Sequence, residues 1–276
     1  MDILQAIFIG IVQGLTEFLP VSSSAHLIFV QNLLGISEPE LAFDVLLHFG
    51  TLIAVISYFF KDIIEMIKAF LSSIADIFRG KFKEGFKEDS YKKLVWMVII
   101  ATIPVGIIGI IFNNEIEAIF SNLTIPAFFL LITGVLLYVS ARLNIGQRDI
   151  KGSSLKESIL VGIGQACALI PGLSRSGTTI ASGLLVGMDK EFAAKFSFLL
   201  AIPAILGATV IQLKDIGAGL GTNLVPYVLG FLAALISGYL AISVLLKLIR
   251  EKSLDIFAFY CWIVGAIVLV YSLFFI

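Results

Sequence analysis

Two short stretches of this chain hold polar side chains whose types and spacing could carry out phosphoryl chemistry. In the first stretch, Gln13 and Glu17 are four residues apart, and Ser23 and His26 are three apart. Each pair shares one face if its segment is helical. A carboxylate and a carboxamide oxygen can hold a hard divalent cation, and an imidazole can act as a general base toward water or Ser23. This stretch therefore predicts acid–base and cation-binding functions.

The second stretch spans residues 171–179, reads PGLSRSGTT and separates two apolar segments. Its Arg175 is the only Lys or Arg between Lys156 and Lys190. An unpaired guanidinium at membrane depth costs about 2.5 kcal/mol or more, so an anionic group is expected beside it. Helix N-terminal N–H groups and the forked donors of arginine both suit a phosphate. The alternative is a helix break whose arginine pairs with a structural carboxylate.

The composition places these residues in a membrane. The chain has 276 residues, of which 59% are hydrophobic and 14% charged, and its mean hydropathy is +1.04. Soluble domains average about 45–50% apolar and 25% charged residues, so an integral membrane protein is predicted. The net charge of −1 gives no case for nucleic-acid binding.

Each polar stretch divides an apolar segment into two helices, and the shorter helix cannot cross a bilayer by itself. The first is flanked by predicted helices over 3–18 and 24–34, and residues 157–187 repeat this design. A helix of 11 residues is about 17 Å long, whereas the hydrocarbon core is about 30 Å thick. Each broken segment is therefore either one interrupted span or a hairpin that returns to its own face. Full spans are predicted at 41–60, 94–112, 123–141, 191–212, 224–246 and 255–275, and an amphipathic helix on the membrane surface at 62–78.

The two halves of the chain are related by an internal repeat. Residues 10–13 match residues 162–165 at Gly, Ile and Gln, and Pro20 and Ser23 match Pro171 and Ser174 at nearly the same offset. We expect a single membrane domain over 1–276, built from repeat units 2–142 and 155–275 with a cytoplasmic loop 143–154 between them.

Charge distribution favours hairpins over interrupted spans. If the broken segments are hairpins, each unit crosses three times and the second unit is inverted. Sixteen of the nineteen Lys and Arg residues then fall on one face, which the positive-inside rule makes cytoplasmic. The sequence thus predicts an all-α polytopic membrane protein with an inverted-topology repeat, in which each unit has one re-entrant hairpin and three transmembrane helices. Both termini lie outside, and the hairpin tips meet near the midplane.

With these two motifs in place, the chain closely resembles the undecaprenyl-diphosphatase family, the bacitracin-resistance phosphatases. One motif is Gln/Glu-x-x-x-Glu followed by Phe-Leu-Pro-Val-Ser-Ser at residues 13–23, with His26 after it, and the other is Pro-Gly-x-Ser-Arg-Ser-x-x-Thr at 171–179. The resemblance covers nearly the whole chain. It implies hydrolysis of undecaprenyl diphosphate to undecaprenyl phosphate and phosphate, with Mg²⁺ or Ca²⁺ as cofactor. This activity recycles the lipid carrier for cell-wall polymer synthesis and confers bacitracin resistance.

The resemblance also implies functions for particular residues. It makes catalytic positions of Glu17, Ser23, His26, Ser174, Arg175 and Thr179. It assigns substrate binding to Ser174, Arg175, Ser176, Gly177 and Thr179, and metal binding to Glu17 and Gln13, although Gln13 is a weaker ligand than a carboxylate. Whether a serine or a water attacks is left open. His48 and Asp44, on the next span, are expected to be structural.

Partners and location follow from the same resemblance. The expected partners are a polyprenyl diphosphate substrate and membrane lipid, and a homodimer is compatible with the sequence. The site is expected to open to the outer face of a cell (plasma) membrane that the chain crosses several times. The inverted repeat motivates an alternative function, a polyprenyl-phosphate flippase or transporter. A structural membrane subunit is disfavoured because of its buried Arg and Glu residues.

Overall fold

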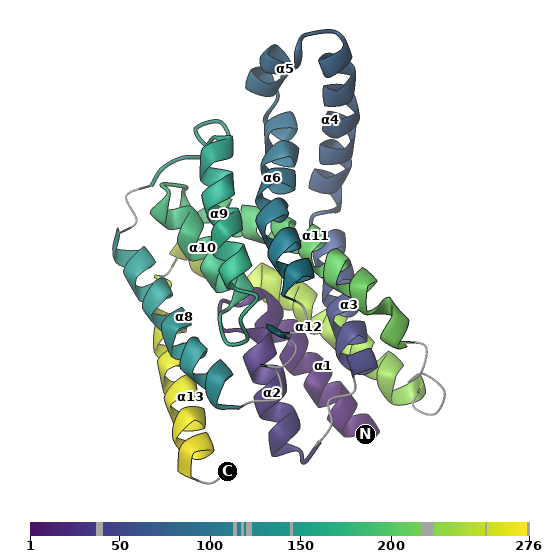
Figure 1. Ribbon diagram of the computed structural model, residues 1–276, viewed down its shortest axis with the longest axis vertical. Helices are drawn as coiled ribbons and strands as arrows, with labels where there is room; N and C mark the ends of the chain where they lie inside the picture. Colours follow the sequence, from purple (N-terminus) through teal and green to yellow (C-terminus); the bar gives the residue numbers. More distant parts are fainter. Residues whose placement is uncertain are drawn as a thin grey trace.

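The computed structural model describes residues 1–36, 41–112, 115–116, 119, 123–143, 146–216, 224–251 and 253–274. Within these ranges the chain forms twelve helices (Figure 1). They are α1 (Ile3–Phe18), α2 (Ser23–Leu33), α3 (Leu41–Tyr58), α4 (Phe60–Phe78), α5 (Phe82–Glu88), α6 (Ser90–Ile111), α8 (Thr124–Leu143), α9 (Leu155–Cys167), α10 (Arg175–Leu185), α11 (Lys190–Ile216), α12 (Leu224–Glu251) and α13 (Asp255–Phe274).

Five long helices coincide with predicted spans, and the predicted span 41–60 forms α3, which counts as a span only together with α4. The five, α6, α8, α11, α12 and α13, are long and apolar enough to cross a bilayer, and the α3–α4 pair adds a sixth if it counts as one span. This confirms an all-α polytopic membrane protein. The axis bends by 80° between α3 and α4, and α4 then packs against α6, where Trp96 Nε1 donates to Ser73 Oγ. The helix expected over 62–78 is therefore present, and its position on a membrane surface stays a prediction.

The two broken segments form helical hairpins. Met1, before α1, and Leu34 and Ile36, after α2, pack against the same apolar cluster, so the two ends of α1–α2 lie together. In α9–α10, Arg148 N donates to Gly187 O at 3.1 Å, which brings the end of α10 back to the segment that precedes α9. Local sequence determines where each hairpin begins, since capping boxes start both α1 and α9.

The tips of the two hairpins touch. Ser176 Oγ, at the start of α10, donates to Leu19 O, at the end of α1, at 3.0 Å. The second tip is also held by α8, where Thr133 Oγ1 donates to Gly172 O at 2.9 Å and accepts from Ser174 N at 3.0 Å. Gly172 has φ +99°, a backbone conformation that favours glycine. These contacts fix the first residues of α2 and α10 relative to each other.

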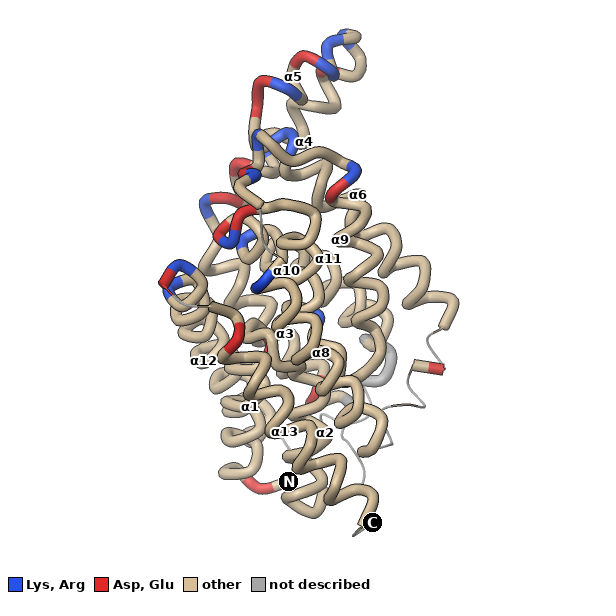
Figure 2. The backbone as a smooth tube through the Cα atoms, turned by 90° about the vertical axis from the view of Figure 1, so that its left-hand side faces the viewer, with Lys and Arg blue, Asp and Glu red and all other residues tan. Residues whose placement is uncertain are grey.

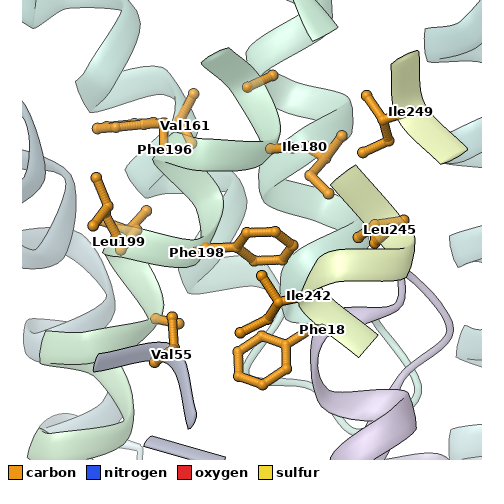
Figure 3. Close-up of a cluster of buried hydrophobic side chains, with 14 of the residues drawn as sticks. Phe18, Val55, Val161, Ile180, Phe196, Phe198, Leu199, Ile242, Leu245 and Ile249 are labelled. Carbon is orange, nitrogen blue, oxygen red and sulfur yellow. The ribbon is translucent and has the colours of Figure 1, made fainter. Parts of the chain in front are cut away.

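A buried apolar cluster supports the tips from one side. Figure 3 shows Phe18, Phe198 and Ile242 converging from α1, α11 and α12, and the rings of Phe18 and Phe198 meet edge to face at 5.6 Å. Helix α1 lies very close to α12, because a Cβ at Gly14 would lie 2.0 Å from Ser237 Oγ. The final turn of α1 is thereby held by packing, and this turn carries Glu17.

Charged residues are concentrated at one end of the molecule. Figure 2 shows most Lys, Arg, Asp and Glu residues at the end that holds α4 and α5, whereas both termini lie at the opposite end (Figure 1). This separation agrees with the charge argument made from the sequence. The orientation in a membrane, and the inversion of one repeat relative to the other, stay predictions.

Candidate active site

Glu17 is the centre of a buried polar network between the hairpin tips. Its Oε1 accepts from Arg175 Nη2 at 2.6 Å. Its Oε2 accepts from Ser23 Oγ at 2.6 Å and from Gln13 Nε2 at 2.9 Å, and His48 Nε2 lies 3.8 Å away. Only 7% of Glu17 is exposed, so these donors, rather than bulk water, solvate its negative charge.

Helix positions explain how this network assembles. Gln13 and Glu17 lie one turn apart near the end of α1, Ser23 is the first residue of α2, and Arg175 is the first residue of α10. Arg175 and Glu17 are 158 residues apart in sequence, and they meet because the tips touch. The anion expected beside the buried arginine is therefore Glu17. This ion pair is the carboxylate pairing that the sequence offered as an alternative, and it lies inside the predicted site.

The hydroxyl groups of the second tip hold the start of α10. Ser174 Oγ caps the helix by accepting from Gly177 N at 3.0 Å. Thr179 Oγ1 donates to Arg175 O at 2.8 Å and forms a 2.6 Å hydrogen bond with Ser197 Oγ of α11. The predicted Ser174, Ser176 and Thr179 are thus all brought next to Arg175, but each is only 1% exposed. Their contacts position Arg175, and direct contact with substrate stays a prediction.

His26 lies in the first turn of α2 but does not pair with Ser23. Its Nδ1 is 2.8 Å from Ser22 O, and its Nε2 is 2.8 Å from Tyr260 Oη of α13. The acceptor of the Ser23 hydroxyl is Glu17, so the base in contact with this serine is the carboxylate and not the imidazole. Ser22 itself has φ +68° and is the one non-glycine residue with positive φ in the described part of the chain. Such strain is concentrated at functional sites.

Three site residues were not identified from the sequence. His48 was expected to be structural, yet it is the group next to Glu17 on α3. Tyr260 and Ser197 lie in apolar segments of the second half, and no local pattern marks them. The one local signal that could have marked His48 is its position four residues after Asp44 on one helix face. In α3, His48 Nδ1 bonds to the backbone oxygen of Asp44 at 2.8 Å.

The residues at the first tip suit a divalent cation that is only partly coordinated by protein. Gln13 Oε1 is buried without a hydrogen-bond partner among the described residues, and it is carried by the same side chain that bonds Glu17. No cluster of three or more His, Cys, Asp or Glu residues that could hold a metal occurs in the described ranges. One carboxylate and one carboxamide oxygen fit a hard cation whose other ligands are phosphate oxygens and water.

Fold and site together define a multi-pass membrane protein with a carboxylate–guanidinium–hydroxyl site between two hairpin tips. The chain belongs to the bacitracin resistance protein BacA family, whose model matches residues 6–267. It is 66% identical over 274 residues to the undecaprenyl-diphosphatase of Methanobrevibacter smithii and 49% identical to that of Methanosphaera stadtmanae, with 99% of each chain covered in both cases. It is 45% identical to the undecaprenyl-diphosphatase of Alkaliphilus metalliredigens, over 99% of this chain and 100% of the relative.

Proposed function

We propose that this protein hydrolyses undecaprenyl diphosphate to undecaprenyl phosphate and inorganic phosphate. The observation that carries the proposal is the buried Glu17–Arg175 pair with the Ser23 hydroxyl bonded to the same carboxylate. The names of the relatives agree with it, and they do not favour the alternative of a lipid flippase. In this function the chain recycles a lipid carrier for cell-wall polymer synthesis and confers resistance to bacitracin.

Arg175 and the N–H groups at the start of α10 bind the diphosphate. The guanidinium presents forked donors that match two phosphate oxygens, and the N-terminus of α10 adds a favourable dipole. When Arg175 turns toward the phosphate, Glu17 loses its strongest partner and becomes a better base. Before substrate arrives, the ion pair with Glu17 holds the Arg175 guanidinium in position.

Ser23 is the proposed nucleophile, because its hydroxyl already donates to Glu17. Its Oγ attacks the terminal phosphorus, its proton passes to Glu17, and the bond to the bridging oxygen breaks, so that undecaprenyl phosphate leaves. Water then attacks the phosphoserine while His26, one turn further along α2, accepts a proton from the water. The Ser23 oxygen recovers its proton from Glu17, inorganic phosphate departs, and His26 releases its proton to solvent.

We propose Mg²⁺ or Ca²⁺ as the cofactor, held by Glu17 and by Gln13 Oε1. The support is the unpartnered Gln13 oxygen beside a carboxylate. A bound cation of this kind would supply positive charge that offsets the charge of the diphosphate.

The proposed location is the cell membrane, with the inverted repeat units 2–142 and 155–275 sending one hairpin in from each face. The concentration of charge at the end of α4 and α5, opposite both termini, supports this orientation. The lipid then reaches the site laterally, and the site opens to the outer face.

The experiment measures phosphate release from a C55 polyprenyl diphosphate by the purified protein in detergent, with Mg²⁺, Ca²⁺ or EDTA. Metal-dependent release should be lost in Ser23→Ala and Arg175→Ala and retained in the matched control Ser24→Ala. Substrate labelled with ³²P at its terminal phosphate should label Ser23 transiently. A Ser23→Ala variant with full activity would exclude the serine nucleophile, and no release by the folded wild type would redirect the proposal to lipid flipping in liposomes.

A further inference from the structure

His26 has a defined hydrogen-bond partner at each ring nitrogen. Nδ1 faces the backbone carbonyl of Ser22 at 2.8 Å, and Nε2 faces the hydroxyl of Tyr260 at 2.8 Å. The imidazole and phenol rings are nearly parallel, with an interplanar angle of 11° and centroids 5.6 Å apart. His26 is buried, whereas Tyr260 is 42% exposed, so Tyr260 covers the side of the imidazole that carries Nε2.

These partners determine the tautomer of His26. A backbone carbonyl only accepts hydrogen bonds, so Nδ1 must carry the proton. In the neutral ring Nε2 then holds the lone pair, and the Tyr260 hydroxyl donates to it. The two contacts therefore select one tautomer, whose accepting nitrogen is Nε2.

The position of Tyr260 is fixed by its neighbours on α13. Cys261 is buried with its Sγ 3.7 Å from Pro20 O, which joins α13 to the first tip. Trp262 Nε1 donates to Leu131 O at 3.1 Å, and its indole packs so closely on α8 that a Cβ at Gly134 would lie 2.5 Å from Nε1. Consecutive residues of α13 thus contact the first tip and α8, and Tyr260 is placed against His26 by this packing.

We propose that Tyr260 is a positioning residue for the reaction, which keeps Nε2 of His26 as the nitrogen that accepts a proton. The inference rests on the proposed function, in which His26 takes a proton from water. The one lone pair of Nε2 is bonded to the phenol in the resting ring, so the Tyr260 hydroxyl turns aside when water delivers its proton. A phenol suits this position because it donates to Nε2 in neutral imidazole and, on returning, accepts from Nε2–H of imidazolium. Tyr260 therefore supports the ring both before and after proton uptake, and phenylalanine could do neither.

The test combines kinetics with ¹⁵N NMR of histidine. The chain has only two histidines, so ¹⁵N-histidine labelling gives two sets of ring signals, and His48→Gln assigns them. Wild-type His26 should show the Nδ1–H tautomer. Tyr260→Phe should change the ring ¹⁵N shifts of His26 and lower kcat by about 10- to 100-fold with KM unchanged, the range found when a metal-ligating histidine loses its orienting hydrogen bond.

Tyr239→Phe is the matched control. Tyr239 is also 42% exposed, and it packs against the Tyr58 ring rather than against a histidine. This variant should keep wild-type kcat and wild-type histidine signals.

Two results would overturn the inference. One is a Tyr260→Phe variant with wild-type kcat and unchanged His26 signals, and the other is a wild-type His26 whose proton is on Nε2. The second result needs no variant, so a Tyr260→Phe protein that fails to fold leaves the inference testable. A wild type that releases no phosphate would instead refute the proposed function, while the tautomer measurement still tests the Tyr260 bond.

Discussion

The Glu17–Arg175 ion pair should be a large and coupled contribution to stability. The perturbation is a double-mutant cycle with Glu17→Gln, Arg175→Met and the double variant. Their side chains are 6% and 16% exposed and their charged atoms are 2.6 Å apart, so each single variant leaves a charge in a site with little water. Removing one partner of a buried pair typically costs about 3–5 kcal/mol.

The contacts predict which single variant is the more costly. After Arg175→Met, Glu17 keeps hydrogen bonds from Ser23 and Gln13. After Glu17→Gln, the guanidinium keeps only an amide oxygen and the Ser197 carbonyl, which is 3.5 Å from Nη1. We therefore expect Arg175→Met near the lower limit of about 3 kcal/mol and Glu17→Gln above it. The double variant buries no unpaired charge, so it should lose at least about 2 kcal/mol less than the sum of the singles.

The assay is reversible unfolding in mixed micelles of increasing SDS fraction, followed by the fluorescence of the two tryptophans. Helical circular dichroism of each variant before unfolding provides the control for gross misfolding. If the stability loss of the double variant equals the sum of the two single losses to within about 0.5 kcal/mol, the two charges are not paired in the folded protein. The account of how Arg175 is positioned would then be refuted.

Three further outcomes follow from particular contacts. Gly14→Ala should destabilise the protein by about 1–3 kcal/mol in the same assay, because its Cβ would lie 2.0 Å from a side-chain oxygen of α12. The control is Gly106→Ala, which has open space around it and should be neutral or stabilising by up to about 1 kcal/mol. Ser22→Val should lower the free energy of unfolding by about 1–3 kcal/mol, because a β-branched residue is strained at φ +68°. Ser22→Gly should unfold near the wild-type SDS fraction, and equal losses in the two variants would argue against backbone strain at Ser22. Lys195→Met should lower the free energy of unfolding by about 1.5–3 kcal/mol, because it removes the 2.6 Å contact with Asp62. An SDS midpoint of unfolding equal to that of the wild type would show that this contact does not join α4 to α11.

The sequence alone determined the elements of this protein. Apolar segments of about 20 residues predict transmembrane helices, because in the bilayer core the backbone N–H and C=O groups must form their hydrogen bonds within the helix itself. The predicted span 224–246 became α12 at Leu224–Glu251, and the hairpin helix 3–18 became α1 at Ile3–Phe18. Proline and serine at each tip end one helix and cap the next, and these are local effects. The family and the two motifs could be recognised for the same reason, since each motif is one continuous stretch.

The partners within the site were decided only by tertiary structure. The sequence placed Glu17 and Arg175 on opposite tips and predicted an anion beside the arginine, but the choice of Glu17 depends on contacts between residues 158 apart. The spacing of Ser23 and His26 placed both on one face of a helix and left water or Ser23 as the group on which His26 acts, whereas the folded chain pairs His26 with Tyr260, which is 234 residues away. Spacing along a helix gives the face on which a side chain lies. The residue that it meets is set by how α12 and α13 dock against the hairpins, and this docking depends on packing across the whole bundle.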